Sequence, residues 1–231
     1  MFSHPFFYFI LFINVRKENL ILESQRRKLL EFAGVNIVAN SNFISVDIQE
    51  AYKDAFTFDI YSFTSFLNEN YSLMRSLTFL YNGESMGFPG ETDYKYWLLE
   101  NGLDEEVLDG ADFYDKGYAF FRYCMDTGID ESEIVDLIKF MINHNINDSR
   151  DIDEEMWGEF MSEYNYDESD IRELLEYADD MINIPDLMEY LERFGGDIVI
   201  TGGGINECLK EVEIALDALD KSYKVYDKFV Y

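Results

Sequence analysis

The sequence predicts an α/β protein with a doubly wound, mainly parallel sheet in a Rossmann-like, three-layer arrangement. Two buried strands at 42–49 and 76–83 flank a helical stretch at 61–74, which together form a βαβ unit, and such units are normally parallel and right-handed. A further apolar strand at 197–201 runs into three glycines and then into a helix at 206–219. These strand-to-helix successions are typical of parallel sheets covered by helices.

Two shorter strands complete the expected sheet. The segment ADFYDKG at 111–117 is predicted to form a strand that ends near Lys116, after a loop marked by GFPG at 87–90. The segment YKVYDKFVY at 223–231 is rich in β-branched and aromatic residues and predicts a last strand. A surface helix is expected at 16–32.

The chain divides by composition into three parts. Residues 1–41 form an N-terminal extension and helix, residues 42–129 and 186–231 form the α/β domain, and residues 130–185 form an acidic helical insertion. Between 130 and 180 there are 18 acidic and 3 basic residues, with apolar positions at helical spacing. Acidic pairs resembling capping boxes begin at Asp130, Asp151 and Asp167. The insertion is therefore expected to hold three helices that fold as a unit.

The apolar run PFFYFILFI at 5–13 resembles the central part of a signal peptide. No lysine or arginine precedes it, no small-residue cleavage site appears, and it is shorter than the roughly 20 residues that span a bilayer. It is interpreted as an added N-terminal strand or a non-native leader rather than a membrane anchor.

Composition excludes several classes of partner. A net charge of -29 opposes binding to nucleic acids and to anionic membranes, because both need lysine and arginine to neutralise phosphates, whereas a basic protein partner is compatible. The only two cysteines, Cys124 and Cys208, form no CxxC motif and indicate neither a disulfide framework nor a zinc ribbon. A reducing cytoplasm is the simplest location for such a soluble chain. The oligomeric state is left open, a homo-oligomer included.

Cys208 is the first candidate functional residue, because it lies in the first turn of the helix that follows the glycine turn 202–204. Unpaired N–H groups and the helix dipole at that position favour a thiolate and can hold an oxyanion. The alternative is a buried cysteine that behaves as a small apolar residue. The glycines could instead cradle a phosphate, but TGGGIN lacks the GxGxxG spacing.

Asp47 and Lys116 each end a predicted strand, where open α/β sheets bind ligands. Asp47 could act as a base, or it could be a helix N-cap or turn residue for the segment beginning at Ile48. Lys116 could lower a thiol pKa and orient a carboxylate, or it could be a solvated charge beside Asp115.

Metal and cofactor sites are not indicated. His4 and His144 are the only histidines, and neither lies near a predicted strand end with a carboxylate or cysteine partner. The carboxylates of DSRDIDEE at 148–155 lack the central glycine and closing glutamate of a calcium loop. The sequence therefore predicts a site with no metal and no cofactor.

Taken in order, VDIQ at Asp47, DKGYAFF at Lys116 and VITGGGINECLKEVEIALDAL at Cys208 resemble the isochorismatase-like cysteine hydrolases, which include nicotinamidases. The similarity covers about residues 42–129 and 186–231. It implies that Asp47 is the general base, Cys208 the nucleophile and Lys116 the residue that holds their charges in place. It also implies an oxyanion hole from the backbone N–H groups of Gly204 and Cys208, and a cis peptide between Gly203 and Gly204. The metal ligands of nicotinamidases have no match here.

Two functions of different classes follow from these observations. One is cysteine-dependent hydrolysis of a small amide or related C–N substrate, or of an ether, through an Asp47–Lys116–Cys208 triad. The other is a non-catalytic acidic module that binds a basic protein or mimics nucleic acid through its charged insertion.

Overall fold

The computed structural model describes residues 38–116, 129–178 and 186–231. The apolar run at 5–13, the predicted helix at 16–32 and Cys124 lie outside these residues. The expected functional residues Asp47, Lys116 and Cys208 lie within them.

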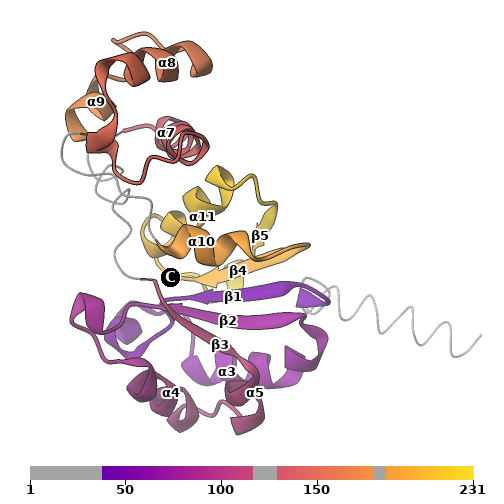
Figure 1. Cartoon of the computed structure of the whole chain (residues 1–231). Helices are drawn as coiled ribbons and strands as arrows, with labels where there is room; N and C mark the ends of the chain where they lie inside the picture. Colours follow the sequence, from indigo (N-terminus) through magenta and orange to yellow (C-terminus); the bar gives the residue numbers. More distant parts are fainter. Residues whose placement is uncertain (1–37, 117–128, 179–185) are drawn as a thin grey trace, which may run out of the picture.

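A five-stranded sheet, parallel throughout, forms the centre of the molecule (Figure 1). The strands are β1 (Asn42–Val46), β2 (Ser76–Tyr81), β3 (Asp112–Asp115), β4 (Ile198–Gly202) and β5 (Tyr223–Val225), in the order β3-β2-β1-β4-β5. The chain builds the sheet outward from β1 through β2 to β3, and then returns to the other side of β1 with β4 and β5. The predicted α/β, doubly wound class is confirmed.

Helices cover both faces of the sheet. One face carries α3 (Ile60–Asn70), α4 (Glu91–Glu100) and α5 (Glu105–Gly110), and the other carries α10 (Asp186–Glu192) and α11 (Cys208–Ala218) (Figure 1). Short 3-10 turns lie at Glu50–Ala55, Tyr71–Leu73, Glu84–Met86, Ser149–Asp151 and Asp227–Phe229. None of the helices in the described ranges combines the length and the apolar character needed to cross a bilayer.

Alternation along the strands produces two apolar cores. Phe43 and Phe79 are fully buried on the side of α3 and α4, whereas Ile44, Leu80 and Ile200 are fully buried on the side of α10 and α11. Successive side chains of a strand point to opposite faces, so a strand buried on both faces is apolar nearly throughout. This pattern explains why β1 and β4 were recognisable in the sequence.

Two parts of the α/β domain differ from the sequence-based expectation. The segment between β2 and β3 contains α4 and α5, which were not predicted; α4 alternates charged and aromatic residues and has only Tyr94 and Leu98 buried. The last strand was predicted over 223–231, but β5 ends at Val225 and a 3-10 turn follows. Phe229 of that turn is fully buried against α3 aromatic rings, so its apolar character serves the core rather than a strand.

The acidic insertion contains α7 (Glu131–Asn143), α8 (Glu154–Tyr164) and α9 (Arg172–Ala178). Asp130 caps α7 as expected, accepting a hydrogen bond from the Ser132 N–H at 2.9 Å. The cap of α8 is Asp153 rather than the predicted Asp151. The backbone N–H of Asp167 donates to the Asp170 carboxylate, and the N–H of Asp170 donates to the Asp167 carboxylate. Both residues precede the start of α9.

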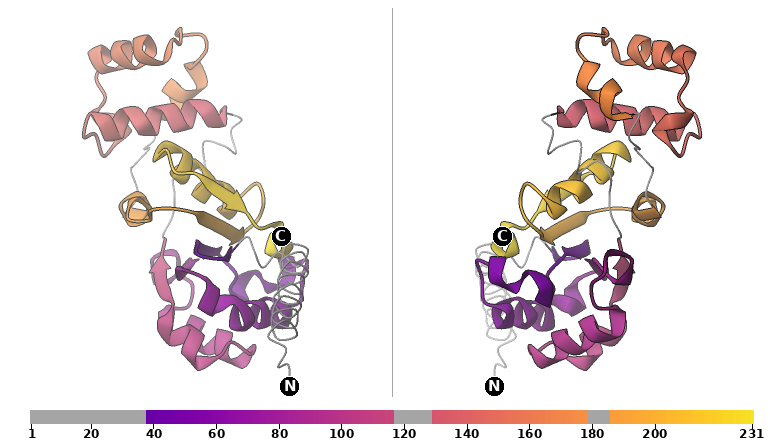
Figure 2. Two further views of the ribbon diagram at one scale, coloured as in Figure 1. Left: turned by 90° about the vertical axis from the view of Figure 1, so that its right-hand side faces the viewer. Right: turned by 90° about the vertical axis from the view of Figure 1, so that its left-hand side faces the viewer.

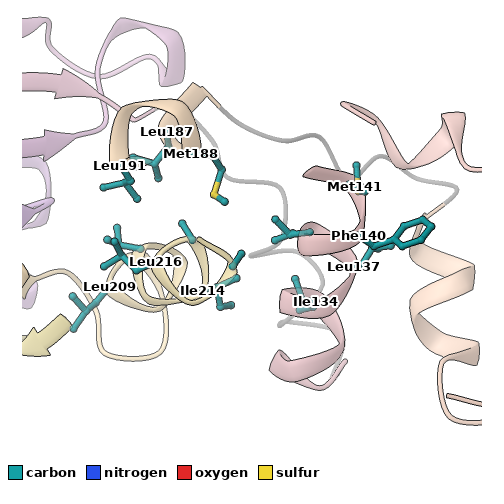
Figure 3. Packing of buried hydrophobic residues seen from close by; sticks show 14 of the residues in the cluster. Ile134, Leu137, Phe140, Met141, Leu187, Met188, Leu191, Leu209, Ile214 and Leu216 are labelled. Carbon is teal, nitrogen blue, oxygen red and sulfur yellow. The ribbon is translucent and has the colours of Figure 1, made fainter. Parts of the chain in front are cut away.

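The insertion packs against the α/β domain through α7, which lies beside α11 in both views of Figure 2. Five apolar side chains of α7 are buried in the same cluster as those of α10 and α11: Ile134, Leu137, Ile138, Phe140 and Met141. Figure 3 shows Ile134 on the side of α7 that faces α11, whereas Phe140 points away from α10 and α11, toward α8, where its ring contacts that of Phe160. The compositional boundary of the insertion is therefore not a boundary of the hydrophobic core.

Candidate active site

The candidate site lies where the strand order reverses. Asp47 follows β1, Asn82 follows β2, Lys116 follows β3, and Cys208 follows β4 after the glycine turn. Because all strands are parallel, their carboxyl ends meet at one edge of the sheet, and the strand order reverses between β1 and β4, which is where open α/β sheets generally bind ligands. The three residues selected from the sequence are brought together at this edge.

Asp47 is fully buried and has a left-handed backbone conformation, with φ of 48°. Aspartate tolerates this region better than most residues. Its N–H donates to the Leu80 carbonyl at 2.9 Å, which continues the β1–β2 pairing by one residue. It is not a helix cap, because the turn that follows is capped by Gln49. The strained, buried position directs its carboxylate into the site.

Lys116 is the cation of the site. Its side chain is only 2% exposed, and its Nζ lies 3.2 Å from Asp47 Oδ2. Burial disfavours the charged ammonium, but the carboxylates of Asp47 and Glu211 outweigh burial and raise the pKa of Lys116 above its usual range. The alternative of a solvated charge beside Asp115 is therefore wrong.

Cys208 is the first residue of α11 and is 3% exposed. Burial raises the pKa of its thiol well above the usual range, and the Asp47 carboxylate, to which the thiol hydrogen-bonds, adds to the rise. The Lys116 ammonium lowers the pKa but does not compensate. The expectation that the helix terminus and a lysine would favour a thiolate is corrected: burial and the adjacent Asp47 carboxylate favour the thiol.

Glu211 completes the buried cluster and was missed in the sequence. It lies three residues after Cys208, on the same face of α11, and is 1% exposed. Its Oε2 accepts a hydrogen bond from Lys116 Nζ at 2.9 Å. The signal that could have revealed it is its spacing from Cys208, since positions three apart share a helix face.

A second set of polar residues holds Asp47 from the side of β2. Asn82 Nδ2 donates to Asp47 Oδ2 at 3.3 Å and to the Tyr52 hydroxyl at 2.9 Å. The side chain of Gln49 fixes Asn82 through two bonds with its backbone, of 2.9 and 3.1 Å. The Tyr231 hydroxyl donates to the Asp47 carbonyl at 2.9 Å. None of these residues was selected from the sequence.

The turn between β4 and α11 requires glycine at two of its three positions. Gly202 and Gly203 have φ of 81° and 67°, and the turn ends at Gly204, which has no positive φ. A Cβ on Gly202 would lie 2.3 Å from the Val46 carbonyl oxygen, and one on Gly203 would lie 2.7 Å from the Leu209 nitrogen. The described residues contain no cis peptide bond, so the expected cis bond between Gly203 and Gly204 is wrong.

Alanine at these glycines is expected to separate the two kinds of position. Gly202→Ala and Gly203→Ala should each lower the free energy of unfolding by about 1–3 kcal/mol or more, because a side chain there adds backbone strain and a clash. Gly204→Ala is the matched control and should change it by about 0.5 kcal/mol or less, since Gly204 has no positive φ and the nearest atoms to its Cβ would be those of the Glu207 side chain, at 3.2 Å or more. Urea unfolding measures all three, and equal midpoints would contradict the assignment.

The same turn is closed by the residue Tyr231. The Ile205 N–H donates to the Tyr231 carbonyl at 3.1 Å, and the Tyr231 N–H donates to the Gly203 carbonyl at 3.1 Å. One amide that a phosphate cradle would need is thus already bonded, which disfavours the phosphate alternative. Gly204 is the last glycine of this turn, and Cys208 is the first residue of the helix that follows it. These are the two residues expected to supply oxyanion donors.

Within the described ranges, no three histidine, cysteine or acidic side chains are grouped so that they could hold a metal ion. The two carboxylates of the site instead share the ammonium of Lys116. Comparison of the chain with family models, curated proteins and solved structures gave no match.

Proposed function

We propose that this chain is a cysteine-dependent hydrolase of small amides or related C–N substrates, with a chemistry like that of the isochorismatase-like hydrolases it resembles. One observation carries the proposal: Asp47, Lys116 and the thiol of Cys208 meet, buried, at the reversal point of the sheet. A base hydrogen-bonded to a nucleophile and fixed by a third group is the general arrangement for nucleophilic catalysis.

The acylation step begins with the thiol. As Cys208 Sγ bonds to the substrate carbonyl carbon, Asp47 takes the thiol proton and the carbonyl oxygen becomes an oxyanion. Because the thiol pKa is raised, proton transfer accompanies the attack rather than preceding it. Backbone N–H groups of Gly204 and Cys208 are the proposed oxyanion donors, and one such donor typically contributes about 2.7–4 kcal/mol.

Proton balance is completed by the same carboxyl group. When the C–N bond breaks, protonated Asp47 gives its proton to the leaving nitrogen, and a thioester remains on Cys208. Water then attacks the thioester and gives a proton to Asp47, and the departing sulfur regains that proton as the C–S bond breaks. Lys116 stays charged throughout and offsets the negative charge that moves between Asp47 and the sulfur.

Ammonia release from a panel of small primary amides, nicotinamide included, tests this function. Cys208→Ser and Asp47→Asn should each lower turnover at least about 10²-fold, the lower range for a positioned acid–base group. Cys124→Ser is the control and should retain turnover. A panel with no turnover by the unsubstituted protein, or a Cys208→Ser variant with unchanged turnover, would contradict the proposal.

An acidic module that binds a basic protein is the second candidate. The observation in its favour is an open groove of about 670 Å³ between α7 and the end of α11, lined by five carboxylates and two lysines (Asp130, Glu131, Asp136, Asp217, Asp220, Lys139 and Lys221). Lys139 is paired with Asp220 at 2.6 Å. In this reading, Cys208→Ser would leave binding to a basic protein intact, and that binding would weaken with added salt.

A further inference from the structure

The buried cluster contains one acidic group more than the proposed reaction needs. Glu211 Oε2 lies 2.9 Å from Lys116 Nζ, closer than the 3.2 Å that separates this nitrogen from Asp47 Oδ2. The side chains of Lys116 and Glu211 are each 2% exposed, and that of Asp47 is 0% exposed. Two carboxylates therefore share one ammonium away from solvent.

Packing alone does not account for an acid at this position. The other buried residues of α11 are Cys208, Leu209, Val212, Ile214, Ala215, Leu216 and Ala218, all of them apolar or nearly so. A buried carboxylate is costly unless it is paired and hydrogen-bonded, and an apolar side chain of similar volume is often better tolerated. The position of Glu211 one turn after Cys208 instead places its charge beside the thiol and the lysine.

We propose that Glu211 is a positioning residue of this site: it holds the Lys116 ammonium against α11 and takes up part of its charge, so that Cys208 rests as a thiol. The inference deepens the proposed function, because it assigns the resting protonation state of the proposed nucleophile. The proton then stays on sulfur until a substrate carbonyl arrives and Asp47 can accept it. This arrangement protects the sulfur from electrophiles and oxidants that react with thiolates.

The groups that face the thiol come from several elements. Asp47 follows β1, Lys116 follows β3, and Glu211 lies on α11 itself. Burial is the largest cause that favours the thiol, the Asp47 carboxylate adds to it and Glu211 adds less, whereas Lys116 favours the thiolate. The hydroxyls of Tyr52 and Tyr231 also lie near, and burial raises the pKa of both, so they stay neutral near pH 7. Removing the charge of Glu211 therefore shifts the balance toward the thiolate.

The test is the alkylation rate of Cys208 by iodoacetamide as a function of pH, followed by mass spectrometry of the peptide that contains it. Glu211→Gln keeps the side-chain shape and removes the charge. A fall of about one unit in the thiol pKa would raise the thiolate fraction, and with it the alkylation rate near pH 8, about tenfold. Glu213→Gln is the matched control on the same helix: its carboxylate pairs with Lys210 at 3.0 Å and should leave the profile in place.

Thermal unfolding of both variants separates positioning from a structural role, since a merely structural ion pair would change the melting temperature and leave the pH profile unmoved. A folded Glu211→Gln variant with an unchanged profile would overturn the proposal. A second test needs no variant at position 211. The thiolate absorbance of the unsubstituted protein, taken as the difference from that of Cys208→Ser, should be negligible near pH 7. A clear thiolate signal at that pH would also overturn the proposal. If Cys208→Ser retains turnover, the proposed function fails while these thiol measurements still decide the role of Glu211.

Discussion

Lys116→Met is expected to destabilise the protein by about 3–5 kcal/mol, the cost typical of removing one partner from a buried ion pair. The substitution leaves the carboxylates of Asp47 and Glu211 buried without the cation that both contact. Urea unfolding monitored by circular dichroism measures the loss. Because the folded-state pKa of Lys116 is raised, its contribution is present in full below the unfolded value of about 10.4 and declines as the pH rises above it.

Lys95→Met is the matched control for this prediction. Lys95 pairs with Glu91 at 2.6 Å on the surface, with side chains 35% and 48% exposed, so its loss should cost about 1 kcal/mol or less. Adding Glu211→Gln to Lys116→Met should restore part of the stability, since it removes one of the two buried negative charges that contact Lys116 in the unsubstituted protein. A loss in Lys116→Met no larger than in Lys95→Met would show that the cluster is not electrostatically coupled.

Replacing residues 130–178 with a short linker is expected to abolish cooperative unfolding of the remaining α/β domain or to cause it to aggregate. The deletion removes α7 from a cluster that includes α10 and α11, and so exposes apolar side chains that are buried in the intact protein. Each large apolar side chain that becomes exposed costs about 1.5–3 kcal/mol, and a few of them equal the roughly 5–15 kcal/mol that stabilise a typical domain. Thermal unfolding and size-exclusion chromatography measure the outcome.

A charge control separates packing from electrostatics in this experiment. Glu154 and Glu155 are exposed in the first turn of α8, and replacing both with glutamine lowers the insertion's charge without touching the cluster. That variant should keep its cooperative transition. A monomeric, cooperatively unfolding deletion protein would show that the α/β domain folds without the insertion, as the compositional boundary alone suggests.

The sequence predicted the centre of the fold because β1 and β4 are buried on both faces. Such strands read as continuous apolar runs, and the residues that follow them, Asp47 and the glycine turn before Cys208, then stand out at the strand ends. Lys116 was recognisable because it ends the next short predicted strand, although that strand, β3, is an edge strand and only partly buried. These three residues could be selected because each follows a strand, and the end of a strand can be recognised from the local sequence pattern alone.

Features that depend on contacts between distant segments could not be predicted. Glu211 looks like one more charged residue on an amphipathic helix until Lys116, which follows β3, is placed against it. The state of the Cys208 thiol depends on how deeply the residue is buried, and this burial outweighs the Lys116 ammonium, which alone would lower the thiol pKa. Likewise, α7 has an ordinary apolar stripe, and only the packing shows that the stripe meets α11.

The reversal of strand order also has a consequence for how the site forms during folding. Asn42 of β1 donates to the carbonyl of Gly195, just before β4, across a separation of 153 residues. Contacts of such high sequence separation form late, because the entropy of closing a long loop must be overcome before any pairing energy is gained. Asp47 follows β1 and Cys208 follows β4, so the carboxylate and the thiol lie on opposite sides of this late pairing. In an emerging chain the two groups therefore meet only when the last strands have docked.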